Sequence, residues 1–382
     1  MKRHWAWCCG VALLLWSAAA AAAGDWAPRA PDFPVKSYLL MDYHSGAILA
    51  EKDAGEPFEP ASITKLMTAY VVYRALADQL VAMDDRVRIS EKAWRTGGSR
   101  MFVEVGKEVA LRDLVAGMVV QSGNDASIAL AEHIAGTEEA FVGMMNETAD
   151  LLKLSGSNFR NVSGLPEEGH YMTALDVATL SRAMIRDFPD HYRLYAQREF
   201  TYGGITQHNR NKLLWQARDL GVDGLKTGHT EDAGYCLAAS AKQGDMRLVS
   251  VVLGSAGDAK RFQQTTELLR YGFRFYRTSR LFESAQALTQ VRVWGGLRQY
   301  ADLGLMNDFY VTYPKVSGGK VRTELSVRED VSAPVGRHQT LGAARAFFSD
   351  RLLREEPLAA LEMVPEGGFF RRLSDGFMRL FE

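Results

Sequence analysis

The stretch PASITKLMTAY (residues 60–70) places Ser62 and Lys65 three positions apart, at the start of an apolar run with helical spacing. Pro60 is typical of the first turn of a helix, and the spacing puts both side chains on one side of that helix. A lysine has a pKa near ~10.4 and becomes a useful base only where burial or a nearby positive charge lowers that pKa. Taken alone, the pattern is more typical of a helix N-cap with a solvated lysine.

Two further segments change this interpretation. QSGNDAS (residues 121–127) contains Ser-Gly-Asn, and DGLKTGHT (residues 223–230) contains Lys-Thr-Gly. In this order the three segments resemble the Ser-x-x-Lys, Ser-Asp-Asn and Lys-Thr-Gly set of serine β-lactamases and penicillin-binding proteins, with Ser-Gly-Asn replacing Ser-Asp-Asn. One such triplet is common by chance, whereas three in order indicate a shared active site.

Under this resemblance, three residues carry the catalysis. Ser62 attacks a carbonyl and becomes an acyl ester, and Lys65 takes its proton. Ser122 relays a proton between Lys65 and the leaving amine. Asn124 binds the substrate backbone and orients Lys65. The oxyanion is expected between backbone N–H groups of Ser62 and of the strand near residue 229.

The Lys-Thr-Gly segment is expected to bind the substrate. Lys226 supplies a positive charge that keeps Lys65 neutral and attracts a carboxylate, and Thr227 supplies a hydroxyl to that carboxylate. Gly228 lets the substrate approach the strand closely. His229 and Arg210 are further candidate binding residues, although a solvated histidine and a surface arginine explain them about as well.

The first 23 residues predict a secretory signal peptide. Lys2 and Arg3 are followed by an apolar stretch and by small residues that fit cleavage before Gly24. Cleavage removes two of the 45 basic side chains and none of the 46 acidic ones, so no basic excess favours nucleic acid. It also leaves a single cysteine, Cys236, which lies in an apolar strand and is expected to be buried and inert.

The remaining chain predicts two domains. Residues 24–280 run from a hairpin (37–53) through a block of helices (about 90–186) to three strands and a closing helix (259–276), which indicates an antiparallel sheet flanked by helices. Residues 281–364 contain short strands joined by Gly and Pro turns and predict a smaller, β-rich domain. The fold class is therefore mixed α/β with an all-β C-terminal domain.

The tail, residues 365–382, predicts an amphipathic helix that follows a flexible Pro-Glu-Gly-Gly hinge. At about 100° per residue its apolar side chains fall within an arc of roughly 120°, with arginines opposite. This is typical of a helix lying in a membrane interface, although a helix docked on its own domain is the alternative. The apolar arc contains Phe369, Phe370, Leu373, Phe377, Leu380 and Phe381.

At this point nearly the whole mature chain resembles the low-molecular-mass penicillin-binding proteins that act as D-alanyl-D-alanine carboxypeptidases. PASITKLMTAY, SGNDA and VDGLKTGHTEDAGYCLAAS resemble the three signature blocks of this family, and SAPVGRHQTLG and EEPLAAL resemble its C-terminal domain. The resemblance implies a serine enzyme of β-lactamase/transpeptidase-like fold that removes the terminal D-alanine from peptidoglycan pentapeptide stems. It also implies covalent reaction with β-lactam antibiotics, and a peripheral position on the outer, periplasmic face of the cytoplasmic membrane.

Residues 93–105 form a shorter segment than the corresponding active-site loop of the best-known members of this family, and the resemblance implies that this loop influences the rate of deacylation. The eight histidines are scattered and form no HExxH motif, so we expect no metal and no other cofactor. Three alternatives remain open: a serine β-lactamase, a D,D-endopeptidase that cuts cross-links, and a non-catalytic penicillin-binding scaffold that shapes the wall.

Overall fold

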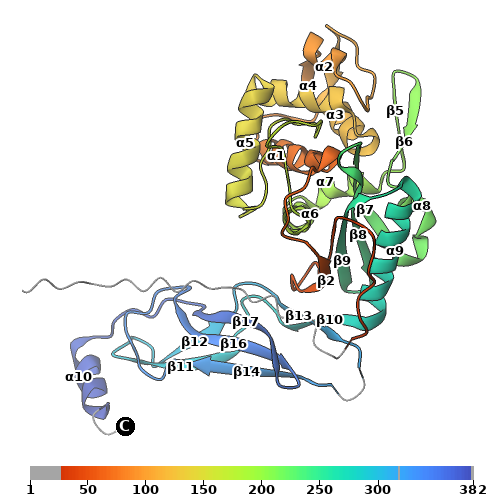
Figure 1. Ribbon diagram of the computed structural model, residues 1–382. Coiled ribbons are helices and arrows are strands. Elements are labelled where there is room, and N and C mark those ends of the chain that lie inside the picture. Colours follow the sequence, from red (N-terminus) through yellow and green to blue (C-terminus); the bar gives the residue numbers. More distant parts are fainter. Residues whose placement is uncertain (1–26, 317–318, 380–382) are drawn as a thin grey trace, which may run out of the picture.

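The computed structural model describes residues 27–316 and 319–379 (Figure 1). The predicted signal peptide lies outside the described residues, as do Leu380 and Phe381 of the apolar arc. In the described ranges, no helix combines the length and the apolarity that a bilayer crossing needs.

A five-stranded antiparallel sheet forms the centre of the larger domain, in the order β2-β1-β9-β8-β7. Side chains on its strands alternate between two cores: Leu39 and Met41 pack on one face, and Tyr38 and Leu40 on the other. Both faces are therefore covered by helices. The strands are β1 (Ser37–Asp42), β2 (Ile48–Lys52), β7 (Val222–Thr230), β8 (Gly234–Gln243) and β9 (Met246–Ser255).

One face of the sheet carries the block of helices expected from the sequence, and the other face carries a single long helix (Figure 1). That long helix, α9 (Asp258–Phe275), lies within one residue of its predicted bounds at each end. The helical block contains η1 (Ala61–Thr64), α1 (Lys65–Ala77), α2 (Glu91–Arg95), α3 (Leu111–Ala116), η2 (Gly117–Gln121), α4 (Asn124–Ala135), α5 (Glu138–Leu151), α6 (Ala174–Asp187), α7 (Pro189–Tyr192) and η3 (Arg193–Ala196).

Two small hairpins and two short helices complete this domain. The helical block is interrupted by β3 (Arg86–Arg88) paired with β4 (Glu108–Ala110), and a second hairpin, β5 (Glu199–Tyr202) with β6 (Ile205–His208), follows it. The short helices α8 (Leu213–Gln216) and η4 (Arg218–Leu220) then lead into β7.

The second domain is β-rich, as predicted, and has its own apolar core. Its six-stranded sheet has the order β14-β16-β17-β12-β11-β15, and a two-stranded sheet pairs β10 with β13. The strands are β10 (Tyr276–Phe282), β11 (Thr289–Trp294), β12 (Tyr300–Gly304), β13 (Phe309–Pro314), β14 (Val321–Val327), β15 (Val331–Ser332), β16 (Thr340–Phe348) and β17 (Arg351–Ala360).

A buried carboxylate joins the two domains. Asp42, at the end of β1, is fully buried and accepts hydrogen bonds from the backbone N–H of Ser45 (2.7 Å) and from the hydroxyl of Thr278 on β10 (2.6 Å). Ser45 also contacts the hydroxyl of Thr312 on β13 at 2.7 Å. A buried carboxylate keeps its charge only where such donors replace water, so this cluster fixes the domain junction.

The tail helix α10 (Phe369–Met378) lies at the far end of the β-rich domain from the catalytic domain (Figure 1). The segment before it differs from the flexible hinge expected from its sequence. Gly296 and Glu366 form an isolated β-bridge, Leu297 N–H donates to Pro365 O at 2.8 Å, and Gly367 N–H donates to Gly295 O at 2.8 Å. Paired backbone groups replace the freedom that the two glycines would otherwise give.

Candidate active site

Ser62 stands on a short 3₁₀ turn that leads directly into α1. The turn begins at Pro60, whose carbonyl accepts the N–H of Ile63 at 3.1 Å. Ile63 is fully buried, whereas Ser62 is only partly buried. The turn therefore anchors the Ile63 side chain in the core and leaves Ser62 partly exposed.

Lys65, one turn further on, is almost fully buried, with 1% of its surface exposed. Its Nζ lies 3.1 Å from Ser62 Oγ, 2.6 Å from Asn124 Oδ1 and 2.6 Å from the carbonyl oxygen of Ser163. A neutral amine has two N–H groups and one lone pair. The amide and the carbonyl accept the two N–H groups, so the lone pair is left for the proton of Ser62.

Burial and, to a lesser extent, the positive charge of Arg210 lower the pKa of Lys65 to about 7, and Asp125 partly opposes them. A substantial fraction of this lysine is therefore neutral at neutral pH. A base is most effective when its pKa lies near the working pH.

Ser122 and Asn124 lie where a π-helical turn, η2, meets the start of α4. Ser122 has a left-handed backbone (φ 69°), and its buried hydroxyl makes no hydrogen bond to any described residue. Asn124 bonds Lys65 through its oxygen and donates through Nδ2 to Gly97 O at 2.7 Å. Asn124 thus connects the lysine to the loop of residues 93–105.

Lys226, Thr227 and Gly228 lie on edge strand β7, and all three are buried. Gly228 faces the serine turn directly, because a Cβ atom placed on it would lie 2.8 Å from Pro60 O. The carbonyl of Gly228 is itself held in place, because the buried guanidinium of Arg261 donates to Gly228 O at 2.8 Å. The strand therefore passes close beside Ser62, and only glycine allows that approach.

The charges around Lys65 and Lys226 differ in one respect from the sequence prediction. Burial holds the pKa of Lys226 well below its usual range, and the positive charges of Lys65, Arg210 and Arg261 lower it further. Arg210, whose Nε donates to Gln121 O at 3.2 Å, is the charge that acts most strongly on Lys65. The permanent positive charge that acts on Lys65 is thus the arginine, which keeps its proton at any working pH.

His229 is exposed at the outer end of this segment, and its ring stacks on Tyr235 with the centroids 4.0 Å apart. Its side chain is therefore accessible from solvent. Cys236, on the neighbouring strand, is fully buried, and burial raises the pKa of its thiol to about 11. This agrees with the prediction of an inert cysteine.

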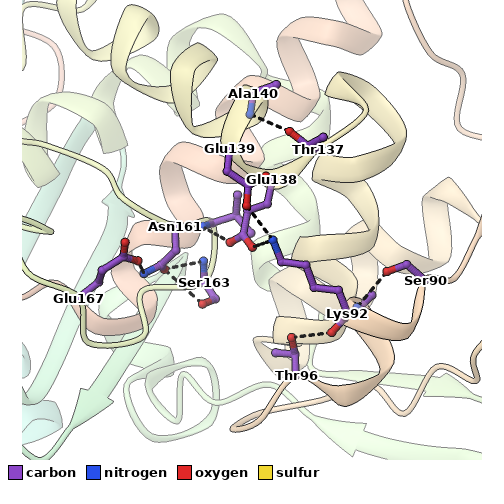
Figure 2. A network of polar contacts seen from close by, with 12 residues as sticks. Ser90, Lys92, Thr96, Thr137, Glu138, Glu139, Ala140, Asn161, Ser163 and Glu167 are labelled. Atoms are coloured by element: carbon purple, nitrogen blue, oxygen red, sulfur yellow. Dashed lines mark hydrogen bonds and ion pairs between the residues drawn. The ribbon is translucent and has the colours of Figure 1, made fainter.

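The segment that supplies the Ser163 carbonyl is held by a polar network (Figure 2). Asn161 Oδ1 accepts the N–H of Gly164 at 2.7 Å. Glu138 accepts the N–H of Val162 at 3.1 Å and pairs with Lys92 at 2.9 Å. The network connects this segment to α5 and α2. It therefore fixes the Ser163 carbonyl, which accepts a hydrogen bond from Lys65 Nζ.

Several functional groups were not found from the sequence. The Ser163 carbonyl is backbone and has no side-chain signature, and only the adjacent Gly164 marks a close approach. Asp125 was overlooked although it directly follows the Ser-Gly-Asn triplet. Its buried carboxylate accepts backbone N–H groups of the active-site loop, from residues 101, 102 and 103.

The sequence and fold match known proteins across both domains. Residues 25–257 match the family of D-alanyl-D-alanine carboxypeptidases, and residues 276–366 match the C-terminal domain of penicillin-binding protein 5. The chain is 41% identical to the D-alanyl-D-alanine carboxypeptidase DacC of Escherichia coli over 97% of this chain and 94% of that protein.

Solved structures agree with this relationship. Penicillin-binding protein 5 from Haemophilus influenzae superimposes with a TM-score of 0.85 at 36% identity, covering 89% of this chain and all of that one. Penicillin-binding protein D2 from Listeria monocytogenes, in its ampicillin-bound form, covers 64% of this chain with a TM-score of 0.59 and 29% identity. The chain therefore belongs to the D-alanyl-D-alanine carboxypeptidase family of low-molecular-mass penicillin-binding proteins, and it is a serine-type carboxypeptidase.

Proposed function

We propose that this carboxypeptidase removes the terminal D-alanine from peptidoglycan pentapeptide stems, with Ser62 as nucleophile and Lys65 as its base. The observation that carries the proposal is the lysine amine. It is buried, its pKa is about 7, and its Nζ lies 3.1 Å from Ser62 Oγ. A lysine in this state accepts the serine proton at neutral pH without a histidine.

The reaction has two chemical steps. Ser62 Oγ attacks the penultimate D-alanine carbonyl while Lys65 takes its proton, and the C–N bond then breaks to leave an acyl ester. Ser122 passes the proton from Lys65 to the departing amine of D-alanine. In the second step a water molecule, deprotonated by the same lysine, hydrolyses the ester and frees Ser62.

The substrate is held by the groups on β7 and by Arg210. The hydroxyl of Thr227 and the guanidinium of Arg210 bind the terminal carboxylate, with Lys226 beside them. His229 lines the rim, and the N–H groups of Ser62 and His229 receive the oxyanion. Recognition of a free carboxylate is what removal of a C-terminal D-alanine requires.

β-Lactams are the second class of ligand. A strained lactam carbonyl beside a carboxylate presents the same two groups to Ser62 and to the carboxylate site as a D-Ala-D-Ala end does. The Listeria relative was solved with ampicillin bound. The proposed product here is a penicilloyl ester on Ser62.

The enzyme is proposed to work outside the cell, on the periplasmic face of the cytoplasmic membrane. Residues 1–23 would direct export, residues 24–280 catalyse, residues 281–364 act as a spacer and residues 365–382 bind the bilayer. Support comes from α10, where Phe370, Phe369 and Leu373 expose 83%, 67% and 63% of their surface. Burial of such a face in the interfacial region of a bilayer is favourable.

The polar face of the same helix is occupied by protein. The buried Asp375 carboxylate accepts Gly295 N–H at 2.8 Å, Arg372 pairs with Glu366 at 3.0 Å, and Arg379 pairs with Asp330. At about 100° per residue, Asp375 lies opposite the middle of the apolar arc. The two readings of the tail are therefore compatible, because a helix docked through its polar face still presents its apolar face to lipid.

Purified muropeptides test the chemical part of the proposal. The chain from Gly24 onward should release D-alanine from pentapeptide monomers, and the Ser62→Ala variant should not. Faster cleavage of cross-linked dimers than of pentapeptides would instead indicate an endopeptidase. Rapid turnover of benzylpenicillin without action on pentapeptides would indicate a β-lactamase, and no reaction with either would indicate a scaffold.

Flotation with phosphatidylethanolamine–phosphatidylglycerol vesicles tests the membrane part. The double variant Phe369→Ser, Phe370→Ser should lose vesicle binding and keep full activity on a soluble peptide. The double variant Leu80→Ser, Leu151→Ser is the matched control, because these two leucines are 68% and 65% exposed in the catalytic domain. Equal flotation of both double variants would overturn the assignment of α10 to the membrane.

A further inference from the structure

The residue before the nucleophile has an unusual backbone. Ala61 is buried and has a left-handed conformation, with φ at 47°. This region is costly for a residue that carries a Cβ atom, and it persists only where the surroundings hold it in place. The contacts of Ala61 therefore show what maintains the geometry of the serine turn.

The first contact is made by Thr64, inside the Ser-x-x-Lys motif. Its buried hydroxyl donates to the carbonyl oxygen of Ala61 at 2.8 Å. The same hydroxyl oxygen lies 2.8 Å from Nε2 of His170, which is distant in the chain and also buried. Since a hydroxyl has one proton and Ala61 receives it, Thr64 must accept a hydrogen bond from the Nε2–H of His170.

The other side of the imidazole confirms this tautomer. His170 Nδ1 accepts the backbone N–H of Arg160 at 3.1 Å, so Nδ1 carries no proton and Nε2 carries one. Burial lowers the pKa of His170 to about 4, and the ring is therefore neutral at neutral pH. The result is a continuous chain of directed hydrogen bonds, from Arg160 through His170 and Thr64 to Ala61.

A glycine, Gly164, also packs closely against the Ala61 carbonyl. Gly164 has φ at 78°, and a Cβ atom placed on it would lie 1.8 Å from the carbonyl oxygen of Ala61. It follows Ser163, whose own carbonyl receives the amine of Lys65 (2.6 Å). The segment that orients the base therefore also encloses the Ala61 carbonyl.

The Ala61 carbonyl and the Ser62 N–H belong to one planar peptide group and point in opposite directions. Any contact that fixes the oxygen therefore fixes the direction of the Ser62 N–H. In the proposed mechanism this N–H is one of the two donors to the oxyanion. From this geometry we infer that Thr64 and His170 are positioning residues that aim the Ser62 N–H at the oxyanion.

The inference rests on the proposed role of Ser62, and neither residue is assigned a contact with substrate. It gives the threonine of Ser-x-x-Lys a task of its own, separate from proton transfer by Lys65. It also gives a task to a neutral histidine that lies outside all three motifs. Loss of one oxyanion donor lowers kcat by about 10²–10³-fold, and a misaligned donor costs part of that.

Thr64→Val is the principal test, because valine keeps the shape and removes the hydroxyl. We expect the acylation rate constant for benzylpenicillin to fall roughly 10–100-fold, with little change in KM for a soluble D-Ala-D-Ala peptide. The midpoint of the pH–rate profile should not move, because the base is untouched. Thr64→Ser restores the hydroxyl and should recover the rate to within about 3-fold.

Ser181→Ala is the matched control. Ser181 is fully buried on α6, and its hydroxyl donates to the carbonyl of Val177 at 2.7 Å. This variant loses a buried hydrogen bond outside the serine turn and outside the segment that holds Lys65. It should lose thermal stability, and it should keep its acylation rate.

Binding of a peptide boronate distinguishes a misaligned oxyanion donor from a nonspecific loss of structure in the variant. The tetrahedral boronate adduct places an oxygen in the oxyanion position. The affinity for the boronate should fall in Thr64→Val in step with the acylation rate. His170→Gln offers an N–H and a carbonyl in place of the two ring nitrogens and should keep more activity than His170→Leu. This pair carries the test if Thr64→Val does not fold.

Acylation of Thr64→Val at the wild-type rate, or equal activity of the two His170 variants, would overturn the inference. So would a shifted pH midpoint, because the threonine would then act on Lys65. A failure of the proposed function is distinguishable, since it would appear in the wild type as the absence of a penicilloyl adduct on Ser62.

Discussion

At the scale of single residues, the proposed chemistry depends on which groups accept the N–H protons of Lys65. Two acceptors, Asn124 Oδ1 and Ser163 O, each lie 2.6 Å from Lys65 Nζ and account for its two N–H groups. The shift of its pKa to about 7 has burial as its largest cause and Arg210 as its second. In the proposed mechanism, desolvation and one fixed charge together allow Lys65 to act as a base.

The charge of Arg210 can be tested through the pH dependence of acylation. Arg210→Gln removes a positive charge that lowers the pKa of Lys65, so that pKa should rise and the acid limb of the profile should move to higher pH. Arg218→Gln, at an exposed arginine, is the control and should leave the limb in place. An unmoved limb in Arg210→Gln would mean that burial alone sets the pKa.

His170 predicts an acid-sensitive component of stability. Its pKa is about 4 in the folded chain against 6.5 in the unfolded chain, so the unfolded state binds more protons between these values. Stability is full above pH 6.5 and falls by about 3 kcal/mol as the pH drops to 4. Urea unfolding of the wild type and of His170→Gln at pH 7 and pH 4 checks this. An equal loss of stability in both proteins would contradict it.

The sequence predicted the pairing of Ser62 with Lys65 because both lie on one helical turn, a distance fixed by local geometry. It also predicted the contact of Asn124 with Lys65, through the Ser-Gly-Asn motif. It could not predict Ser163, because a backbone carbonyl has the same chemistry in every residue. The neutral tendency of Lys226 depends on the burial of the whole strand, which no short segment reveals.

At the scale of elements, the loop of residues 93–105 is organised by the residue that follows Asn124. Asp125 is almost fully buried, and its carboxylate accepts the N–H groups of Met101 at 3.0 Å and Phe102 at 2.9 Å. It also accepts the N–H of Ala126 in its own helix, at 2.9 Å. A buried carboxylate that accepts several N–H groups forms strong, charge-assisted hydrogen bonds, and these bonds fix the backbone of the loop.

Asp125→Ala should therefore release this loop. We expect a loss of about 2–4 kcal/mol in unfolding free energy, because several buried N–H groups lose their acceptor. Trypsin should cleave after Arg100 much faster than in the wild type. Asp150→Ala, at an exposed site on α5, is the control. Unchanged proteolysis at Arg100 would show that other contacts hold the loop.

Elements with a strong local pattern were predicted well, as the hairpin of β1 and β2 and the helix α9 show. The hairpin of β5 and β6 was missed although its strands meet at Gly203–Gly204, a turn signal in itself. Its strands are short and largely exposed, so alternation of apolar residues could not mark them. The π-helical turn before Ser122 also has no periodicity of its own.

At the scale of the whole molecule, three contacts set the geometry. The Asp42 cluster joins the catalytic domain to the β-rich domain, and the bonds of residues 295–297 with residues 365–367 fix the start of α10. Asp375 then docks the helix itself. These contacts hold the apolar face of α10 at a defined orientation. The two adjacent glycines had instead predicted a flexible hinge.

Asp375→Ala tests the docking of α10 separately from its lipid affinity. The apolar face is unchanged, so vesicle flotation should be retained. The helix loses the hydrogen bond to Gly295 and the nearby pairing with Arg371, which lies 3.6 Å away. Trypsin should then cleave faster after Arg371 and Arg372 in the free protein, whereas Ser374→Ala should behave as the wild type. Equal cleavage of the two variants would contradict the docking.

The proposed mechanism depends on a neutral Lys65 that activates Ser62. The most direct test is the rate at which benzylpenicillin acylates the protein between pH 5 and pH 9, with the adduct located by mass spectrometry of the peptide that contains Ser62. We predict an adduct on Ser62 whose rate of formation rises about tenfold per pH unit and levels off near pH 7, the pKa of Lys65. An adduct on another residue, or a rate that still rises tenfold per unit above pH 9, would contradict the account.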